Sequence, residues 1–270
     1  MDTRIVSRVA AIYDIHGNLP ALDAALREID GHDVDLILVG GDVAAGPMPR
    51  PTIDRLMELG DRAEFVRGNA DRLIVAHFDG SYSQDADDHD VWFVRDRWAA
   101  AQITQQHRDF LNAFSESTTL EIEGLGSVLF CHGSPRSDEE IITAKTPDPR
   151  LRAALAGVEP RLVVCGHTHM QFVRSLDDFR IVNPGSVGMP YEGKPGAYWA
   201  LMGPEFSLNR SDYEYAEAAE LFSTSGFPDV EAFIESVLHN PPSPDEATLN
   251  FERRAEEQRA RRDSNPRPSD

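Results

Sequence analysis

The stretch that decides the fold runs from Val9 to Asn18 and reads VAAIYDIHGN. Its first five residues are the short apolar run of a buried strand, and the polar motif Asp14-Ile15-His16-Gly17-Asn18 follows at once. Leu19 to Ile29 then carries apolar residues at steps of three and four, with Pro20 in the first turn, which predicts an amphipathic helix. A strand, a polar loop and a helix in this order predict the start of a βαβ unit.

The pattern repeats outward from this stretch. Leu36 to Val39 and Glu64 to Arg67 are predicted as further strands, separated by a helix that ends near Gly60, so the first 70 residues predict a largely parallel sheet. From Thr118 onward closely spaced strands predict antiparallel hairpins in a second sheet. The two sheets are expected to pack face to face with helices outside.

Composition limits what such a chain can do. Its 270 residues are 41% hydrophobic and 27% charged, which is ordinary for a folded globular protein. A net charge of −20 repels phosphate backbones, so long nucleic acids are not expected partners. There is no apolar run of membrane-spanning length and no signal-peptide core, so we expect no membrane association and a cytoplasmic location. The two cysteines are expected to be free buried thiols; the oligomeric state stays open.

The chain divides into three parts by pattern. Residues 1–240 are expected to form the main domain, and residues 79–115 an acidic, helical insertion that caps it. Residues 241–270 begin with three prolines and are polar throughout, so a disordered or partly helical tail is expected, with a transient helix over Phe251 to Arg262 as one possibility. Such a tail is expected to be dispensable for catalysis.

Polar motifs follow five of the predicted strands. Ligand sites of open α/β sheets form outside the carboxyl ends of strands, so motifs far apart in sequence are expected to meet in one crevice. The five motifs are Asp14-Ile15-His16-Gly17-Asn18, Gly40-Gly41-Asp42, Gly68-Asn69-Ala70-Asp71, His132-Gly133-Ser134 and Gly166-His167-Thr168-His169.

These motifs offer the donor atoms that divalent metals bind. Carboxylate oxygens, an amide oxygen and imidazole nitrogens suit hard to borderline cations, and no thiolate is needed. Two pairs of ligands stand two residues apart, a spacing that places both side chains on one side of an extended chain. Seven candidates exceed the needs of one zinc ion and suit two ions with a shared carboxylate. The candidate metal ligands are Asp14, His16, Asp42, Asn69, His132, His167 and His169.

Together the ordered motifs resemble those of the calcineurin-like metallophosphoesterase family, in particular its compact bacterial and archaeal phosphodiesterase-like branch. The resemblance extends from about Arg4 to Met202. It includes Asn183-Pro184-Gly185-Ser186, which is similar to a loop of that branch, and it leaves the tail out. It implies an α/β fold, a four-layer αββα sandwich of two mixed β-sheets flanked by helices.

The resemblance also implies roles for the ligands. Asp42 would bridge two ions, one of them held also by Asp14, His16 and His169, and the other by the remaining candidates, Asn69, His132 and His167. A hydroxide shared between the ions would attack phosphorus in line. Asp42, Asn69 and His132 are therefore the expected catalytic residues.

One position departs from the family pattern. Many members have a histidine after the metal-binding asparagine that is thought to protonate the leaving group, and Ala70 stands there in this chain. Without such an acid a rate factor of roughly 10² to 10⁴ is lost for poor leaving groups. His77, His89 and His107 are candidates to replace it from the insertion. Asn18 and Arg136 are expected substrate-binding residues, although helix capping also explains Asn18.

The sequence thus predicts a hydrolase, a dinuclear metal-dependent phosphoesterase that acts on small phosphodiesters. Manganese is the expected metal, with iron, zinc, nickel or cobalt as alternatives. One alternative function is a phosphomonoesterase, such as a protein phosphatase or a dinucleoside polyphosphate hydrolase. Another is a metal-binding scaffold without turnover. Small phosphate esters are the expected partners.

Overall fold

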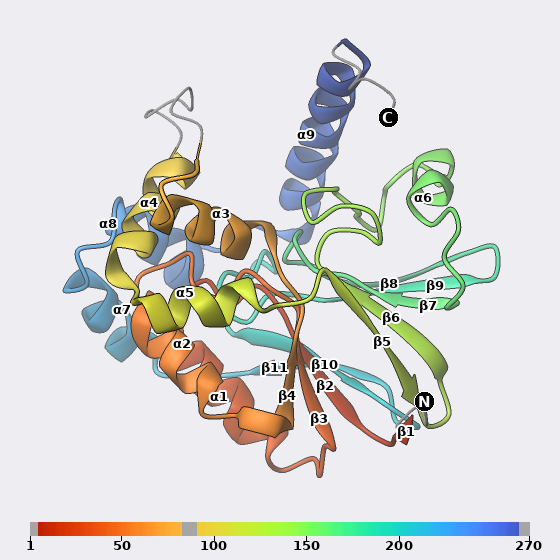
Figure 1. Ribbon diagram of the computed structural model, residues 1–270, viewed down its shortest axis with the longest axis horizontal. Coiled ribbons are helices and arrows are strands. Elements are labelled where there is room, and N and C mark those ends of the chain that lie inside the picture. Colours follow the sequence, from red (N-terminus) through yellow and green to blue (C-terminus); the bar gives the residue numbers. More distant parts are fainter. Residues whose placement is uncertain (1–4, 83–90, 265–270) are drawn as a thin grey trace.

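Two mixed β-sheets lie face to face in the computed structural model, which describes residues 5–82 and 91–264 (Figure 1). The first sheet has the strand order β11-β10-β2-β3-β4, formed by Ser207–Ser211, Ala197–Met202, Val9–Ile12, Leu36–Val39 and Ala63–Phe65. The second has the order β1-β5-β6-β7-β9-β8, formed by Ile5–Val6, Ser117–Ile122, Gly126–Cys131, Leu162–Val164, Phe179–Pro184 and Gln171–Leu176. The short strands β1 and β11 at one edge of each sheet were not predicted from the sequence.

The alternation of side chains along β2 explains the layers. Val9 and Ala11 pack between the two sheets, while Ala10 and Ile12 pack on the outer side against α1 (Leu19–Ile29) and α2 (Pro49–Met57). On the outer face of the second sheet, α6 (Asp148–Ala154) packs over β7 and β8. Because β2 is apolar on both faces, it must lie between two layers. The predicted αββα sandwich is confirmed.

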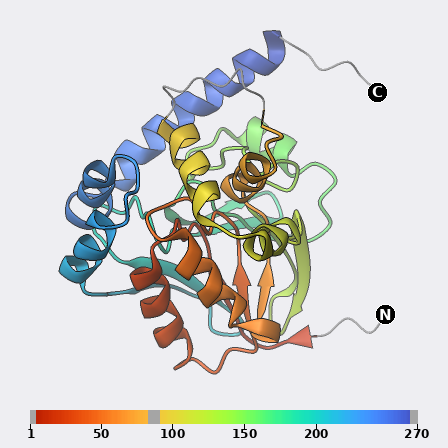
Figure 2. The same cartoon turned by 60° about the vertical axis from the view of Figure 1, so that its left-hand side comes forward.

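The parallel strands bring their carboxyl ends to one edge of the molecule. β2, β3 and β4 are mutually parallel, and so are β6 and β7 in the second sheet. In Figure 2 the red to orange arrows of the N-terminal strands point toward the side on which α4 (Val91–Gln102, yellow) and α9 (Pro244–Ser264, blue) lie. The loops that carry the polar motifs therefore open on this side.

Further helices cover this edge. α3 (Asn69–Phe78) is followed by α4 and α5 (Gln105–Asn112), and both of these pack against α3. α4 and α5 are the two helices expected in the insertion at residues 79–115. Residues 83–90 of that insertion lie outside the described part of the chain. Near the C-terminus, the helices α7 (Tyr215–Ser223) and α8 (Val230–Ile234) pack as one cluster with the π-helical turn η2 (Glu235–His239). The remaining element is the 3-10 turn η1 (Gly60–Arg62), which precedes β4.

The largest difference from expectation is α9. The partly helical alternative for this segment agrees with α9, which begins at Pro244, but the sequence did not predict that the helix packs on the main domain through Ala247, Phe251 and Ala255. These residues bury against Ile141 and Met170. Residues 265–270 of the predicted tail lie outside the described part.

Local features of the sequence explain why α9 forms a helix. Ser243 and Glu246 form a capping box: the Ser243 N–H and hydroxyl donate to the Glu246 carboxylate, and the Glu246 N–H donates back to the hydroxyl. Pro244 suits the first helical position. The three buried apolar residues stand four apart on one face, a pattern hidden by the polar average of the segment. Among the described residues, no helix is both long and apolar enough to cross a membrane.

Candidate metal centre

Six predicted ligands gather in two groups at the carboxyl ends of the strands. Asp14 and His16, which follow β2, meet His169, which follows β7; Asp42, which follows β3, meets His132 and His167 from the second sheet. Within each group the potential ligand atoms lie within 4.8 Å of one another. Both sheets therefore contribute to each group, and only their packing brings the ligands together.

Asp42 and Asn69 connect the groups to each other and to α3. The Oδ2 atom of Asp42 lies 3.4 Å from Nε2 of His132 and 3.9 Å from Nε2 of His16, which belongs to the other group. The Oδ1 atom of Asn69, the first residue of α3, lies 3.2 Å from Nε2 of His132. Asp42 thus occupies the central position expected of a bridging carboxylate.

The histidines are oriented by backbone carbonyls. The Nδ1–H groups of His16, His132 and His169 donate to the carbonyls of Ala45, Gly40 and Met189, at 3.2, 2.8 and 2.8 Å. In the neutral imidazole, this fixes the tautomer in which Nε2 carries a lone pair that points into the site. The Nε2 atoms of His16 and His169 then face each other at 3.2 Å. Two lone pairs at this distance repel each other unless a cation lies beside them.

Two further polar atoms of the site lack a hydrogen-bond partner within the described part of the chain. They are Oδ1 of Asp14 and Nε2 of His167, both buried. Oδ1 of Asp14 lies 3.4 Å from Nε2 of His169. Unpartnered buried polar atoms cost free energy unless an ion or water satisfies them. Oxygen and imidazole donors with free lone pairs, converging from several sides, fit divalent metal ions.

The backbone of the ligand loops is left-handed and not extended. Positive φ angles of 47° to 66° occur at five of the ligands: Asp14, His16, Asp42, His167 and His169. The expectation that ligands two residues apart share one side of an extended chain is therefore wrong. A non-glycine residue with positive φ is held there by its surroundings, and such residues are concentrated at functional sites. The turns point each carboxylate or imidazole back over the strand ends.

Glycines allow two of the loops to touch. Gly41 has a φ of 95°, and a Cβ atom on it would lie 2.4 Å from the backbone nitrogen of Gly68. A Cβ atom on Gly68 would lie 2.1 Å from Oδ1 of Asp42. Only residues without side chains permit this contact, which brings Asn69 to the group that contains Asp42.

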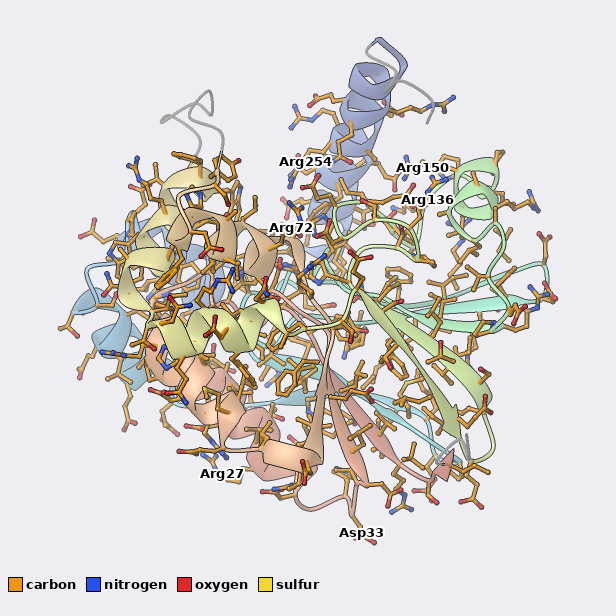
Figure 3. The ribbon with its side chains drawn as sticks, in the orientation of Figure 1. Arg27, Asp33, Arg72, Arg136, Arg150 and Arg254 are labelled. Carbon is orange, nitrogen blue, oxygen red and sulfur yellow. The ribbon has the colours of Figure 1, made fainter. Side chains whose placement is uncertain are left out.

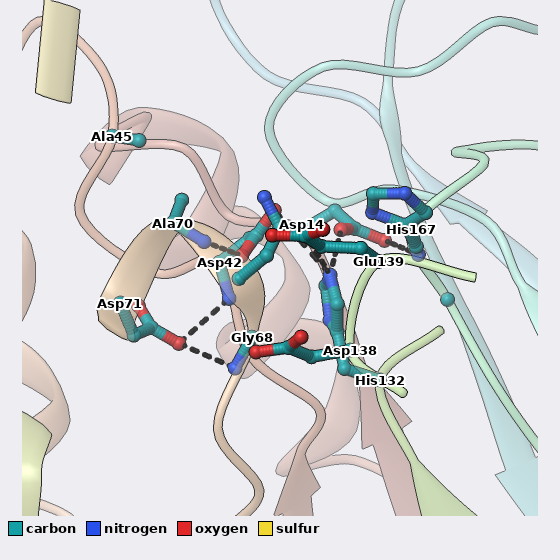
Figure 4. Close-up of polar contacts among 12 residues, drawn as sticks. Asp14, Asp42, Ala45, Gly68, Ala70, Asp71, His132, Asp138, Glu139 and His167 are labelled. Carbon is teal, nitrogen blue, oxygen red and sulfur yellow. Dashed lines mark hydrogen bonds and ion pairs between the residues drawn. The ribbon is translucent and has the colours of Figure 1, made fainter. Parts of the chain in front are cut away.

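Asp71 holds these two loops together by hydrogen bonds to both of them (Figure 4). It is fully buried, and its carboxylate accepts N–H groups of Gly68 and Asp42 at Oδ2 and of Val43 at Oδ1, all at 2.9 Å. Burial, followed by the charge of Asp42, raises the pKa of Asp71 to about 7. The sequence motif contained Asp71, but its role as a positioning residue becomes visible only in the structure.

We expect Asp71→Asn to weaken metal binding about tenfold and to lower the melting temperature, because the amide NH₂ must face at least one backbone N–H in place of an acceptor. Isothermal titration with Mn²⁺ and thermal melting measure the two effects. Asp61→Asn, at an exposed position, serves as the control. Unchanged metal affinity would show that Asp71 does not position the ligand loops.

The charges of the site favour a bound cation. Burial lowers the pKa of His16 to about 4 and of His167 to about 3, assisted by the charges of His169 and His132 respectively. Burial also acts to lower the pKa of His132, but the carboxylates of Asp42 and Asp14 outweigh it and raise that pKa to about 10. The carboxylates thus retain a positive charge near them, as a proton in the absence of metal. Metal binding is expected to displace it.

The two predicted substrate-binding residues are engaged within the protein. Asn18 is completely buried, and its side chain caps α1 through the Ala21 N–H and donates to Gly188 O and to the Tyr213 hydroxyl. The guanidinium of Arg136 donates to both oxygens of Glu140 and to the carbonyl of Ala153. These contacts give both residues a structural role, and their substrate-binding role stays a prediction.

The candidate replacement acids lie away from the ligands. His107 caps α5, with Nδ1 accepting from the Thr104 N–H, and its Nε2 lies 2.9 Å from Oδ1 of Asp54. His77 stacks on Tyr82, with ring centroids 4.4 Å apart. Neither lines the cavity that contains the ligands. His89 lies outside the described residues.

That cavity has a volume of about 290 Å³, and sequence analysis did not identify the wall that α9 forms. Besides His16, Asp42, Asn69, His167 and His169, it is lined by α3, α4, α9 and the loop of Tyr191, through residues Leu73, Trp92, Asp96, Tyr191, Phe251, Arg254 and Gln258. The helical spacing of Phe251, Arg254 and Gln258 was the available signal. Burial raises the pKa of Tyr191 to about 12, so this phenol is a weak acid.

Comparison with known proteins agrees with this geometry. The chain is 26% identical over 244 residues to an uncharacterized protein of Methanocaldococcus jannaschii, covering 83% of this chain and 96% of that protein. It resembles a metallophosphoesterase from Sphaerobacter thermophilus with a TM-score of 0.65 and 26% identity, covering 84% and 97% of the two chains. A hypothetical protein from Pyrococcus horikoshii shares the fold, with a TM-score of 0.74, 19% identity, and 89% and 100% coverage.

A family description supplies the classification. The sequence model of the calcineurin-like phosphoesterase superfamily domain matches residues 8–203, the segment that carries all seven candidate ligands. Members of the family are metal-dependent phosphate-ester hydrolases, and α9 lies beyond the matched segment. With two ligand groups at the predicted strand ends and this match over most of its length, the chain belongs to the calcineurin-like phosphoesterase superfamily.

Proposed function

We propose that the protein is a dinuclear metal-dependent phosphodiesterase that hydrolyses small phosphate esters. The observation that carries this proposal is the pair of ligand groups joined by Asp42, with the Nε2 atoms of His16 and His169 facing each other at 3.2 Å. One ion leaves several of these donors unused, whereas two ions use them all.

The ligand types favour Mn²⁺. Asp14 and Asp42 supply carboxylate oxygens, Asn69 supplies an amide oxygen, and the remaining ligands are imidazoles. Manganese accepts this mixture of oxygen and nitrogen donors. The described cysteines, Cys131 and Cys165, are buried and free, and neither belongs to the ligand groups. Unpaired thiols are also consistent with our placement of the protein in the cytoplasm.

The side chains divide the work of binding and orientation. Asp14, Asp42, Asn69 and the four histidines would hold the ions. When bound, the ions supply the positive charge that stabilises phosphoryl oxygens in the transition state and acidifies water. Asp71 maintains the geometry of the Asp42 and Asn69 loops through its three hydrogen bonds. α4 and α9 enclose the substrate above the ligands and limit the access of water to it.

The test compares a chromogenic diester, bis(p-nitrophenyl) phosphate, with the monoester p-nitrophenyl phosphate. Protein stripped with chelator and dialysed is measured before and after addition of Mn²⁺. Faster hydrolysis of the diester, present only with Mn²⁺, is the expected result. Preference for the monoester would indicate a phosphomonoesterase instead, and metal binding without turnover of either ester would indicate a scaffold.

A second expected result concerns the leaving group. Since Ala70 replaces the usual acid and neither His77 nor His107 lines the cavity, the leaving group is expected to depart without protonation. Aryl diesters should then react about 10² times faster than alkyl diesters, with rates that fall steeply as the leaving-group pKa rises. A series of substituted phenyl esters measures the slope. A flat plot with rate-limiting chemistry would point to another acid, with Asp96 and Glu139 of the cavity as the residues to substitute.

A further inference from the structure

The C-terminal helix forms one wall of the cavity that contains the ligand groups. Phe251, Arg254 and Gln258, one helical turn apart, line it from α9, opposite Leu73 of α3 and Trp92 of α4. Figure 3 labels Arg254 partway along α9. α9 therefore contributes side chains to the site although it lies outside the segment that the family shares.

Arg254 differs from the other arginines around the site. Arg72, Arg136 and Arg150 pair with carboxylates of Asp138, Glu140 and Glu252. In the part of the chain that the structure describes, Arg254 has no such ion pair, and its guanidinium lies over the ring of Phe251, 5.3 Å from the centroid. It is also the only arginine or lysine among the described residues that line this cavity. In a protein with a net charge of −20, it offers positive charge that other side chains have not neutralised.

Phe251 connects Arg254 to the ligand groups by contact. Its ring lies 5.3 Å from the Arg254 guanidinium and 6.4 Å, between centroids, from the ring of His167, which belongs to the group of Asp42. Arg254 thus lines the same cavity as the ligands and is available there to an anionic group of the substrate.

Beside its polar residues, the cavity has apolar and aromatic walls. Leu73, Trp92 and Phe251 line it, and Phe251 is 7% exposed. Two acidic residues outside the ligand groups, Asp96 and Glu139, also line the cavity. Glu139 is paired with Arg72 at 2.7 Å, which reduces its repulsion of an anion. A nucleoside or a similar flat, apolar unit matches such walls, because aromatic side chains stack on its faces.

We propose, on the basis of the phosphodiesterase function above, that Arg254 binds a second phosphate of the substrate while Phe251 and Trp92 flank the nucleoside-like unit that connects it to the reacting group. The substrate class is therefore a small phosphate ester with two anionic groups. Arg254 contributes to substrate binding and not to bond cleavage. Replacement of Arg254 raises KM for such a substrate and leaves kcat nearly unchanged.

The experiment uses two esters that differ in one phosphate. They are the p-nitrophenyl ester of thymidine 5′-phosphate and its analogue with an additional 3′-phosphate, and both release p-nitrophenol. For the full-length Mn²⁺-loaded protein, the 3′-phosphate is expected to lower KM about tenfold. Arg254→Gln removes this preference with kcat within about twofold of the wild-type value. Arg253→Gln, at the exposed neighbouring position, keeps it.

A wild-type enzyme without the preference, or Arg254→Gln with the preference intact, would overturn the inference. If neither ester is hydrolysed by wild type, the proposed function fails and Arg254 is tested by binding alone. Thymidine 3′,5′-bisphosphate is then titrated while tryptophan fluorescence is recorded, since Trp92 lines the cavity. About tenfold weaker binding by Arg254→Gln than by Arg253→Gln supports the role of Arg254 in that case. Equal affinities of the two variants contradict it.

Discussion

Asp42→Asn is expected to weaken the binding of both divalent ions and to lower turnover at least about a thousandfold. Oδ1 of Asp42 accepts the Ala70 N–H at 2.8 Å, which leaves Oδ2 directed at the imidazoles of both groups. In the variant the amide oxygen keeps the hydrogen bond to Ala70. The NH₂ group then points into the centre of the site, with two protons and no charge where a bridging anion is needed.

Elemental analysis after dialysis against Mn²⁺, together with the diester assay, measures this effect. Asp33→Asn is the matched control, because Asp33 also has a positive φ, of 51°, but is exposed and remote from the ligands (Figure 3). Asparagine tolerates that conformation, so the control changes the same charge without strain. Two ions per chain and normal turnover in Asp42→Asn would exclude the bridging role. A wild-type protein that never binds more than one ion would exclude the dinuclear centre.

Truncation after Asn240 is expected to lower kcat/KM about a hundredfold, roughly 2.7 kcal/mol at the transition state. The truncated chain loses Phe251, Arg254 and Gln258, and with them one wall of the cavity. The metal ligands all precede the cut, so metal binding should persist. This outcome is the opposite of the dispensable tail that composition alone suggests.

Truncation also exposes Ile141 and Met170, which α9 now covers, so a variant with a smaller change is needed beside it. Phe251→Ala keeps the full chain, and removal of a buried phenylalanine costs about 3 to 5 kcal/mol of packing. Because α9 is terminal, we expect it to detach while the sandwich stays folded. Hydrogen exchange along α9 reports detachment, and circular dichroism reports the fold. Full kcat/KM in the truncated protein would show that α9 does not form part of the working site.

The ligand types and their place at strand ends could be predicted because both are local properties. A strand that is apolar on both faces, such as Val9 to Tyr13, must be buried, and a polar motif after it must emerge at the edge of the sheet. The strand pattern predicted two packed sheets, and the family resemblance implied the αββα sandwich. The five motifs predicted the ligands, six of which lie in the two groups. Which ligand joins which group depended on the packing of one sheet on the other, and the family resemblance supplied that part.

Other features depended on contacts that no local pattern contains. Arg136 is a plausible anion-binding residue in isolation, and only the fold brings Glu140 and Ala153 to its guanidinium. The left-handed backbone at Asp14 and His169 is imposed by the loops that surround them, against the ordinary preference of those residues.

The sequence by itself determined the layers, the strand ends and the metal-binding chemistry of this protein, because hydrophobic periodicity and donor-atom type act within a few residues. The tertiary structure decided the walls of the site. α9 has a polar average, and its few apolar residues bury only because Ile141 and Met170, about a hundred residues earlier in the chain, lie where the helix can cover them. That long-range contact places Arg254 at the cavity, since burial of Ala247 and Phe251 sets which face of the helix turns toward the ligands.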